Sequence, residues 1–137
     1  MNNNKKEALR WLEQSLQDLE ASKWNKKGGF YPQSCFLSQQ AGEKILKGFL
    51  YGHGERLILG HSLLELLEKC IIYERKLKEI ENSCRILDRF YIPTRYPNVL
   101  PSGTSQQHYT EEDADQSLQA LEKIIYIIKP LIENLPD

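Results

Sequence analysis

Apolar or small side chains recur every three or four residues through most of the sequence, and this spacing is typical of amphipathic helices. The opening segment, residues 5–26, shows it at Ala8, Leu12, Leu16 and Leu19. No segment shows the alternation of apolar and polar residues that indicates a half-buried strand. We therefore expect an all-α fold, an antiparallel up-and-down bundle of four long helices and one short helix, in a single domain over residues 1–137.

Local signals predict where these helices begin and end. Gly28 and Gly29 should end the first helix, and a second should follow over residues 32–51. Ser62 and Thr110 each precede an acidic residue by three positions, a pattern that caps the start of a helix. We expect another helix over residues 73–91, an irregular stretch over residues 92–109, and a kink or an early end at Pro130 in the last helix.

The last helix has more apolar residues than one core-facing stripe needs. Ile124, Ile125, Ile127 and Ile128 cover a wide arc of its surface. A second buried face of this kind would suit a homodimer, which we expect; the alternative is a broad stripe that faces only the core.

Composition excludes several classes of function. A net charge of −1 gives the chain no basic field for extended nucleic-acid binding. The three cysteines are widely spaced on apolar stripes, so we expect reduced, buried thiols. No apolar run is long enough to cross a membrane, and the first residues lead into an amphipathic helix rather than a signal-peptide core. We expect a cytoplasmic protein.

The predicted second helix has a row of polar side chains. Gln40, Lys44 and Lys47 share one face, and Glu43 and Lys47 form a pair four residues apart. This row is either a solvated face with one stabilising ion pair or one wall of a ligand groove. In the second case the lysines would bind phosphates, and the glutamine amide would bind a base or a carbonyl.

Two further places have polar side chains that suit ligand binding. His61 precedes the third helix, where it either bonds to a backbone carbonyl or contacts an anion beside the free amides. Arg95 and Tyr96 lie in the irregular stretch and offer a planar fork for phosphate and a stacking ring. Alternatively, Arg95 pairs with Asp88 or Glu43 and fixes the loop. Both could hold.

Catalytic motifs are absent from the sequence. It has no glycine-rich phosphate loop, no nucleophile elbow and no histidine pair at metal-binding spacing. We therefore expect neither a cofactor nor a metal site, and we do not expect catalysis.

Taken in order, several motifs resemble those of the HEPN family, the nucleotide-binding domains of higher eukaryotes and prokaryotes. They are Gln39-Gln-Ala-Gly-Glu-Lys44 with Lys47, His61-Ser-Leu, Tyr91-Ile-Pro-Thr-Arg-Tyr-Pro97 and Tyr109-Thr-Glu-Glu-Asp-Ala114. The resemblance implies a helical bundle that commonly dimerises and can bind a nucleotide. It also implies, in some relatives, a minimal nucleotidyltransferase partner in a toxin–antitoxin-like pair. Carried over by position, the candidate binding residues are Gln40, Glu43, Lys44, Lys47, His61, Arg95 and Tyr96.

Two alternative functions stay open. Other HEPN proteins are metal-independent ribonucleases with an Arg-x(4–6)-His motif, and Arg56 and His61 match that spacing. The match lies before the third helix, whereas the nuclease motif belongs near the last helices, and Arg95 has no histidine at the required distance. The second alternative is a purely structural dimerisation domain, in which the polar row and Arg95 only hold the fold together.

Overall fold

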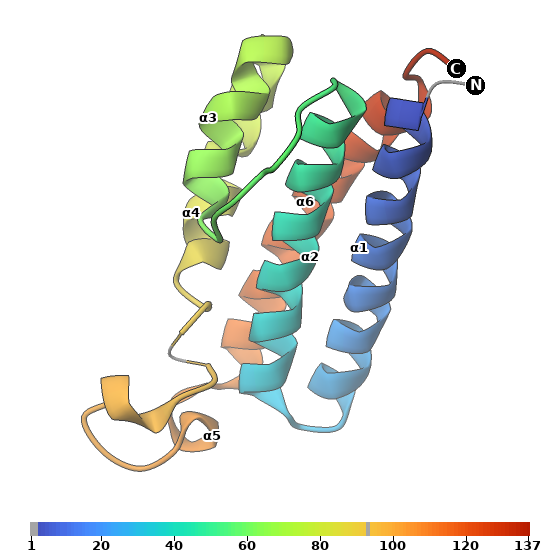
Figure 1. Cartoon of the computed structure of the whole chain (residues 1–137). Coiled ribbons are helices and arrows are strands. Elements are labelled where there is room, and N and C mark those ends of the chain that lie inside the picture. Colours follow the sequence, from blue (N-terminus) through green and yellow to red (C-terminus); the bar gives the residue numbers. More distant parts are fainter. Residues whose placement is uncertain (1–2, 93) are drawn as a thin grey trace.

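Three long helices lie side by side and form the body of the molecule in a computed structural model that describes residues 3–92 and 94–137 (Figure 1). They are α1 (Asn3–Lys27), α2 (Tyr31–Gly52) and α6 (Glu111–Glu133). Helix α1 runs opposite to α2 and α6, so both ends of the chain lie at the same end of the bundle. The predicted all-α fold is confirmed, and the described residues contain no strand. Met1, Asn2 and Pro93, the last a part of one resemblance motif, lie outside the described residues.

A second layer of shorter helices packs beside α2 and α6. It consists of α3 (Leu63–Tyr73), the 3₁₀ helix η1 (Arg75–Ile80) and α4 (Glu81–Asp88). The single helix predicted over residues 73–91 is therefore wrong. The backbone adopts an extended conformation at Glu74, with φ −150° and ψ 101°, and the next six residues form the tighter 3₁₀ helix.

Most predicted helix ends are confirmed. Thr110 caps α6 with both hydrogen bonds of a capping box. Its side chain accepts from the Asp113 amide, and the Asp113 carboxylate accepts from the Thr110 amide. Ser62 caps α3 by accepting from the Glu65 amide. Helix α1 ends at Lys27, and Gly29 adopts φ +83° just beyond it. Pro130 does not end α6, which continues to Glu133.

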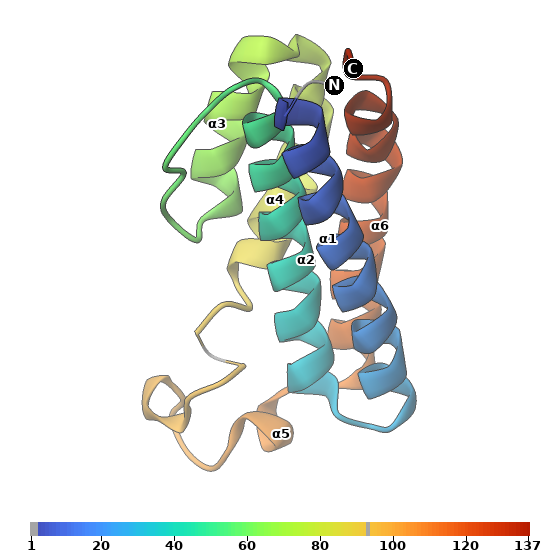
Figure 2. The same ribbon diagram turned by 45° about the vertical axis from the view of Figure 1, so that its right-hand side comes forward.

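The segment between α4 and α6 extends beyond the ends of the long helices (Figure 2). It contains the short 3₁₀ helix η2 (Pro97–Val99) and the four-residue α5 (Ser105–His108). Gln106 Nε2 donates to the Gly29 carbonyl at 2.8 Å and so ties α5 to the turn between α1 and α2. The stretch expected to be irregular thus includes two short helical turns.

One apolar core joins the two layers. Helix α2 is central because almost its entire length is buried between α1, α6 and the shorter helices. The largest fully buried side chains include Ile45, Leu46, Phe49, Leu50, Leu66, Leu77, Leu87, Leu121 and Ile124. The three cysteines, Cys35, Cys70 and Cys84, are free and buried as predicted, and burial raises the pKa of the Cys35 thiol to about 12.

Buried serines connect the three long helices. Ser22 of α1 donates to the Ser34 carbonyl at 2.8 Å and lies 2.8 Å from the Ser38 hydroxyl, both on α2. Ser117 of α6 donates to the same Ser38 hydroxyl at 3.2 Å. These small side chains allow the helices to approach closely, and each buried hydroxyl has a hydrogen-bond partner.

No helix within the described ranges has both the length and the apolar character needed to cross a membrane.

Candidate functional site

Glu43 is the centre of a buried polar group on α2. Its Oε2 lies 3.0 Å from Lys47 Nζ, and its Oε1 accepts a hydrogen bond from Gln39 Nε2 at 3.3 Å. Gln39, Glu43 and Lys47 follow one another at four-residue steps, so the helix itself brings them into contact. All three side chains are buried, which fits an ion pair held inside the fold rather than a solvated polar face.

His61 reaches this group from the segment that links α2 to α3. Its Nδ1 lies 3.3 Å from both carboxylate oxygens of Glu43, and Gln39 Nε2 donates to its backbone carbonyl at 3.1 Å. The ring therefore faces a carboxylate of the same chain rather than a backbone carbonyl. With a proton on Nδ1, the ring donates to Glu43 and leaves Nε2 free to bond a ligand. The His61 ring is more than half exposed.

Asp88 fixes the start of α3, and so the position of His61. Its carboxylate accepts from the Leu63 amide at 2.6 Å, the Leu64 amide at 3.2 Å and the Ser62 hydroxyl at 3.0 Å. The anion site beside His61, one of the two alternatives that the sequence left open, is therefore filled by the chain's own Asp88 carboxylate. An external anion would have to bind elsewhere.

Arg95 lies among three aromatic rings. Its guanidinium carbon is 4.6 Å from the ring centres of Phe36 and Tyr91 and 4.9 Å from that of Tyr96. Its Nε donates to the Tyr91 carbonyl at 3.0 Å. The alternative in which Asp88 or Glu43 tethers Arg95 is wrong, because within residues 3–92 and 94–137 Arg95 forms no ion pair. Among the described residues, Arg95 is thus an exposed, preoriented cation that pairs with no carboxylate.

Tyr91 joins the two parts of the site. The His61 ring stacks on the Tyr91 ring with 4.8 Å between the centres and 18° between the planes, and Arg95 also contacts Tyr91. We call the surface formed by His61, Tyr91, Arg95 and Tyr96 the Arg95–His61 face. Buried Glu43 and Lys47 lie behind His61.

Lys44 and Gln40 are placed differently from Lys47. Lys44 Nζ pairs with Asp18 Oδ2 of α1 at 2.6 Å, and Lys44 lines an open cavity of about 550 Å³ along α1 with Trp11 and Gln14. Gln40 Nε2 donates to Gln39 Oε1 at 2.7 Å. The structure thus connects Lys47 to the Arg95–His61 face through Glu43, whereas it directs Lys44 toward α1.

The residues of the nuclease alternative make separate contacts. Arg56 donates to the Asn4 side chain at 3.2 Å and to the Glu55 carbonyl at 3.4 Å, near the start of α1. His61 contacts Glu43 and Tyr91 instead. No group of three or more metal-binding side chains is present in the described parts of the chain.

Sequence reasoning missed three residues that shape the site. Gln39 and Tyr91 had a usable signal, since Gln39 precedes Glu43 and Tyr91 precedes Arg95 by four positions. Phe36 gave no such signal, because nothing in its spacing indicates contact with Arg95.

Comparison with known proteins identifies the family. The model of the HEPN domain family matches residues 8–131, nearly the whole chain. The chain belongs to the HEPN family.

Solved structures and a curated protein resemble this HEPN domain over most of its length. TT1696 from Thermus thermophilus is 34% identical with a TM-score of 0.84, covering 90% of this chain and 96% of its own. ST0689, an archaeal HEPN homologue, is 36% identical with a TM-score of 0.76, and the match covers 91% of this chain and 97% of ST0689. MJ1304, a candidate toxin of Methanocaldococcus jannaschii, is 26% identical in an alignment of 141 positions that covers 96% of this chain and 91% of that protein.

Proposed function

We propose that this HEPN domain is a non-catalytic module that binds a nucleotide at the Arg95–His61 face. The observation that carries the proposal is the Arg95 guanidinium, which three rings hold in place and no carboxylate neutralises within the described chain. Such a cation is a ready partner for a phosphate, to which it can donate two parallel hydrogen bonds.

The neighbouring side chains suit the rest of a nucleotide. With Nδ1 donating to Glu43, Nε2 of the neutral His61 ring is an acceptor, so it can accept a hydrogen bond from a ribose hydroxyl. The exposed ring of Tyr96 offers a face on which a base can stack. Glu43 and Lys47 would orient His61 from behind rather than touch the ligand, because both side chains are buried.

Binding should be measured by isothermal titration of the full chain with ATP, GTP and AMP. We expect Arg95→Ala to weaken binding at least about tenfold, the loss that follows from removing a charge-assisted pair of hydrogen bonds. Arg85→Ala is the matched control, because Arg85 is an exposed arginine that pairs with Glu81 on α4. Equal binding by the wild type and Arg95→Ala would refute the site.

A Lys44→Ala variant tests how far the site extends. Lys44 pairs with Asp18 and lines the cavity along α1. If the nucleotide lies only on the Arg95–His61 face, this change leaves its affinity unaltered. A loss of affinity equal to that of Arg95→Ala would instead support the wider polar row inferred from the sequence, with Gln40, Lys44 and Lys47 all in reach of the ligand.

We also propose that the module works with a minimal nucleotidyltransferase partner in a toxin–antitoxin-like pair, in the cytoplasm, and as a homodimer. Similarity to the candidate toxin MJ1304 supports the pair, and three buried free thiols fit a reducing compartment. Expression of this chain alone should slow bacterial growth, and co-expression of the proposed nucleotidyltransferase partner should restore growth. Unimpaired growth in both cases would count against the pair.

A further inference from the structure

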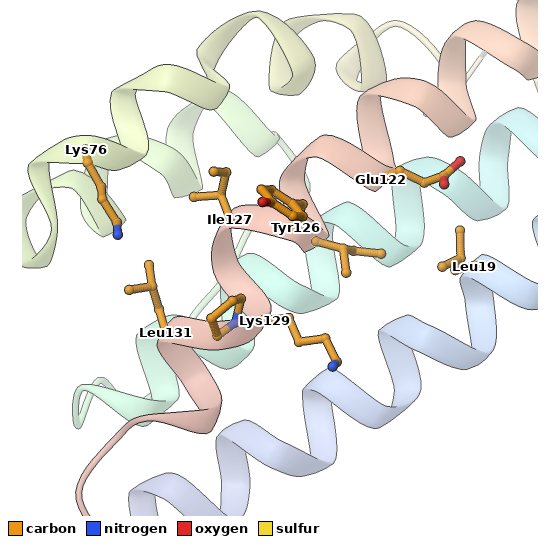
Figure 3. A pocket seen from close by; sticks show the side chains of 9 residues that line it. Leu19, Lys76, Glu122, Tyr126, Ile127, Lys129 and Leu131 are labelled. Carbon is orange, nitrogen blue, oxygen red and sulfur yellow. The ribbon is translucent and has the colours of Figure 1, made fainter.

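The outward side of α6 is an apolar groove that the fold leaves open (Figure 3). The groove has a volume of about 600 Å³ and lies between α1 and η1. Its apolar lining is Leu19, Ile125, Tyr126, Ile127, Pro130 and Leu131. Tyr126 is 80% exposed, so its ring adds open apolar surface to the lining of the groove. The groove shares no residue with the Arg95–His61 face.

Charged side chains of opposite sign border this apolar stretch along the helix. Lys123, Tyr126, Pro130 and Glu133 follow one another at steps of three, four and three residues, so they form one outward stripe. Lys123 is exposed and forms no ion pair with any other described residue. Glu133 contacts Lys129 at 3.3 Å and is about half exposed. The stripe thus has a cation before its apolar part and an anion after it.

We propose that a second copy of this chain covers the groove, with the two α6 helices antiparallel. About a two-fold axis near the level of Ile128, Tyr126 of each copy would pack on Pro130 of the other. Lys123 of each copy would then face Glu133 of the other, so one contact occurs twice, as an interface between identical surfaces requires. A parallel arrangement would instead place Lys123 against Lys123 and Glu133 against Glu133.

This inference rests on the homodimer in the proposed function and adds its surface and register. The apolar centre supplies contact area that excludes water, whereas the flanking charges select the antiparallel orientation. A partner protein with an apolar helix could also occupy the groove, but the stripe's own charges complement a reversed copy of itself.

Sedimentation velocity of the full chain over a range of concentrations tests the inference. The wild type should be a dimer. Lys123→Glu and Glu133→Lys each create two like-charge contacts and should raise the dissociation constant at least about tenfold. Mixing these two variants should restore a dimer, because each contact again joins a lysine to a glutamate. The double variant should also dimerise. Lys69→Glu, on α3, is the control and should leave the dimer unchanged.

The outcomes separate the surface from the dimer itself. Dimers that persist in both single variants would overturn the α6 surface while leaving the homodimer intact. A monomeric wild type at about 100 µM, in the weak range of protein association, would overturn the homodimer and this inference together. Circular dichroism of each variant establishes that a monomer is still folded, and nucleotide binding, measured separately, tests the Arg95–His61 face alone.

Discussion

Lys47 Nζ lies 3.0 Å from Glu43 Oε2 inside the fold, where the two side chains are only 11% and 8% exposed. Removing one partner of such a pair leaves an uncompensated buried charge. We therefore expect Lys47→Met to lower the free energy of unfolding by about 3 kcal/mol in urea denaturation. The double variant Glu43→Gln/Lys47→Met removes both charges and should lose less than the sum of the two single variants. Strict additivity would show that the pair is not coupled.

Asp88 should control both the stability of α3 and the position of His61. Its carboxylate accepts from two amides and one hydroxyl at the start of that helix. Asp88→Ala should cost about 1–2 kcal/mol in urea denaturation, as the loss of a helix cap does. It should also weaken nucleotide binding although Arg95 is intact. Asp88→Asn retains an acceptor but no charge, so we expect an intermediate loss of stability. An Asp88→Ala variant as stable as the wild type would contradict the capping role.

His53 should make stability depend on pH. Its ring lies 4.5 Å from that of Phe49 and 4.6 Å from that of Tyr73, and burial lowers its pKa below the ordinary 6.5, although Glu74 acts in the opposite direction. As pH falls, the unfolded chain therefore takes up the His53 proton before the folded chain does. The stability that the neutral His53 contributes is complete above pH 6.5 and is lost as pH falls toward and through the lower folded pKa. Urea denaturation between about pH 7 and 5 should show a steeper decline for the wild type than for His53→Gln. Parallel curves of stability against pH for the two proteins would disprove this role of His53.

Gly48 allows α1 to pack tightly against α2. A Cβ atom there would lie 2.8 Å from Trp11 Cβ and 3.3 Å from the Ala8 carbonyl oxygen, neither of which can rotate away. Gly48→Ala should therefore lower the free energy of unfolding by about 1–2 kcal/mol despite the better helix propensity of alanine. At Gly42 the added atom would meet the ends of the Leu63, Leu87 and Ile124 side chains and no backbone atom among its nearest neighbours, so Gly42→Ala should cost less. The reverse order in thermal unfolding would contradict this explanation.

The sequence predicted those parts of the fold that local interactions determine. Thr110 and Asp113 are three residues apart, and their reciprocal bonds begin α6 where expected. The break at Glu74 was not predictable, because Leu77, Ile80, Cys84 and Leu87 keep helical spacing and no glycine or proline marks the change. Apolar spacing reports which residues face the core, but it does not distinguish a continuous helix from a 3₁₀ turn joined to a short one.

The candidate site was predictable only in part, for a similar reason. Spacing on α2 placed Glu43 beside Lys47, and that contact is present. The partner of Lys44 depends on how α1 packs, since Asp18 is 26 positions away in the sequence. Likewise, the aromatic setting of Arg95 needs Phe36 from another helix.

The hydroxyl contacts among Ser22, Ser38 and Ser117 also restrict how this domain can respond to a ligand. Sliding any of the three long helices by one turn, about 5.4 Å, would separate these hydroxyls and strand them in an apolar interior. Movement on binding is therefore expected in the connections that hold His61 and Arg95, while α1, α2 and α6 act as a fixed frame.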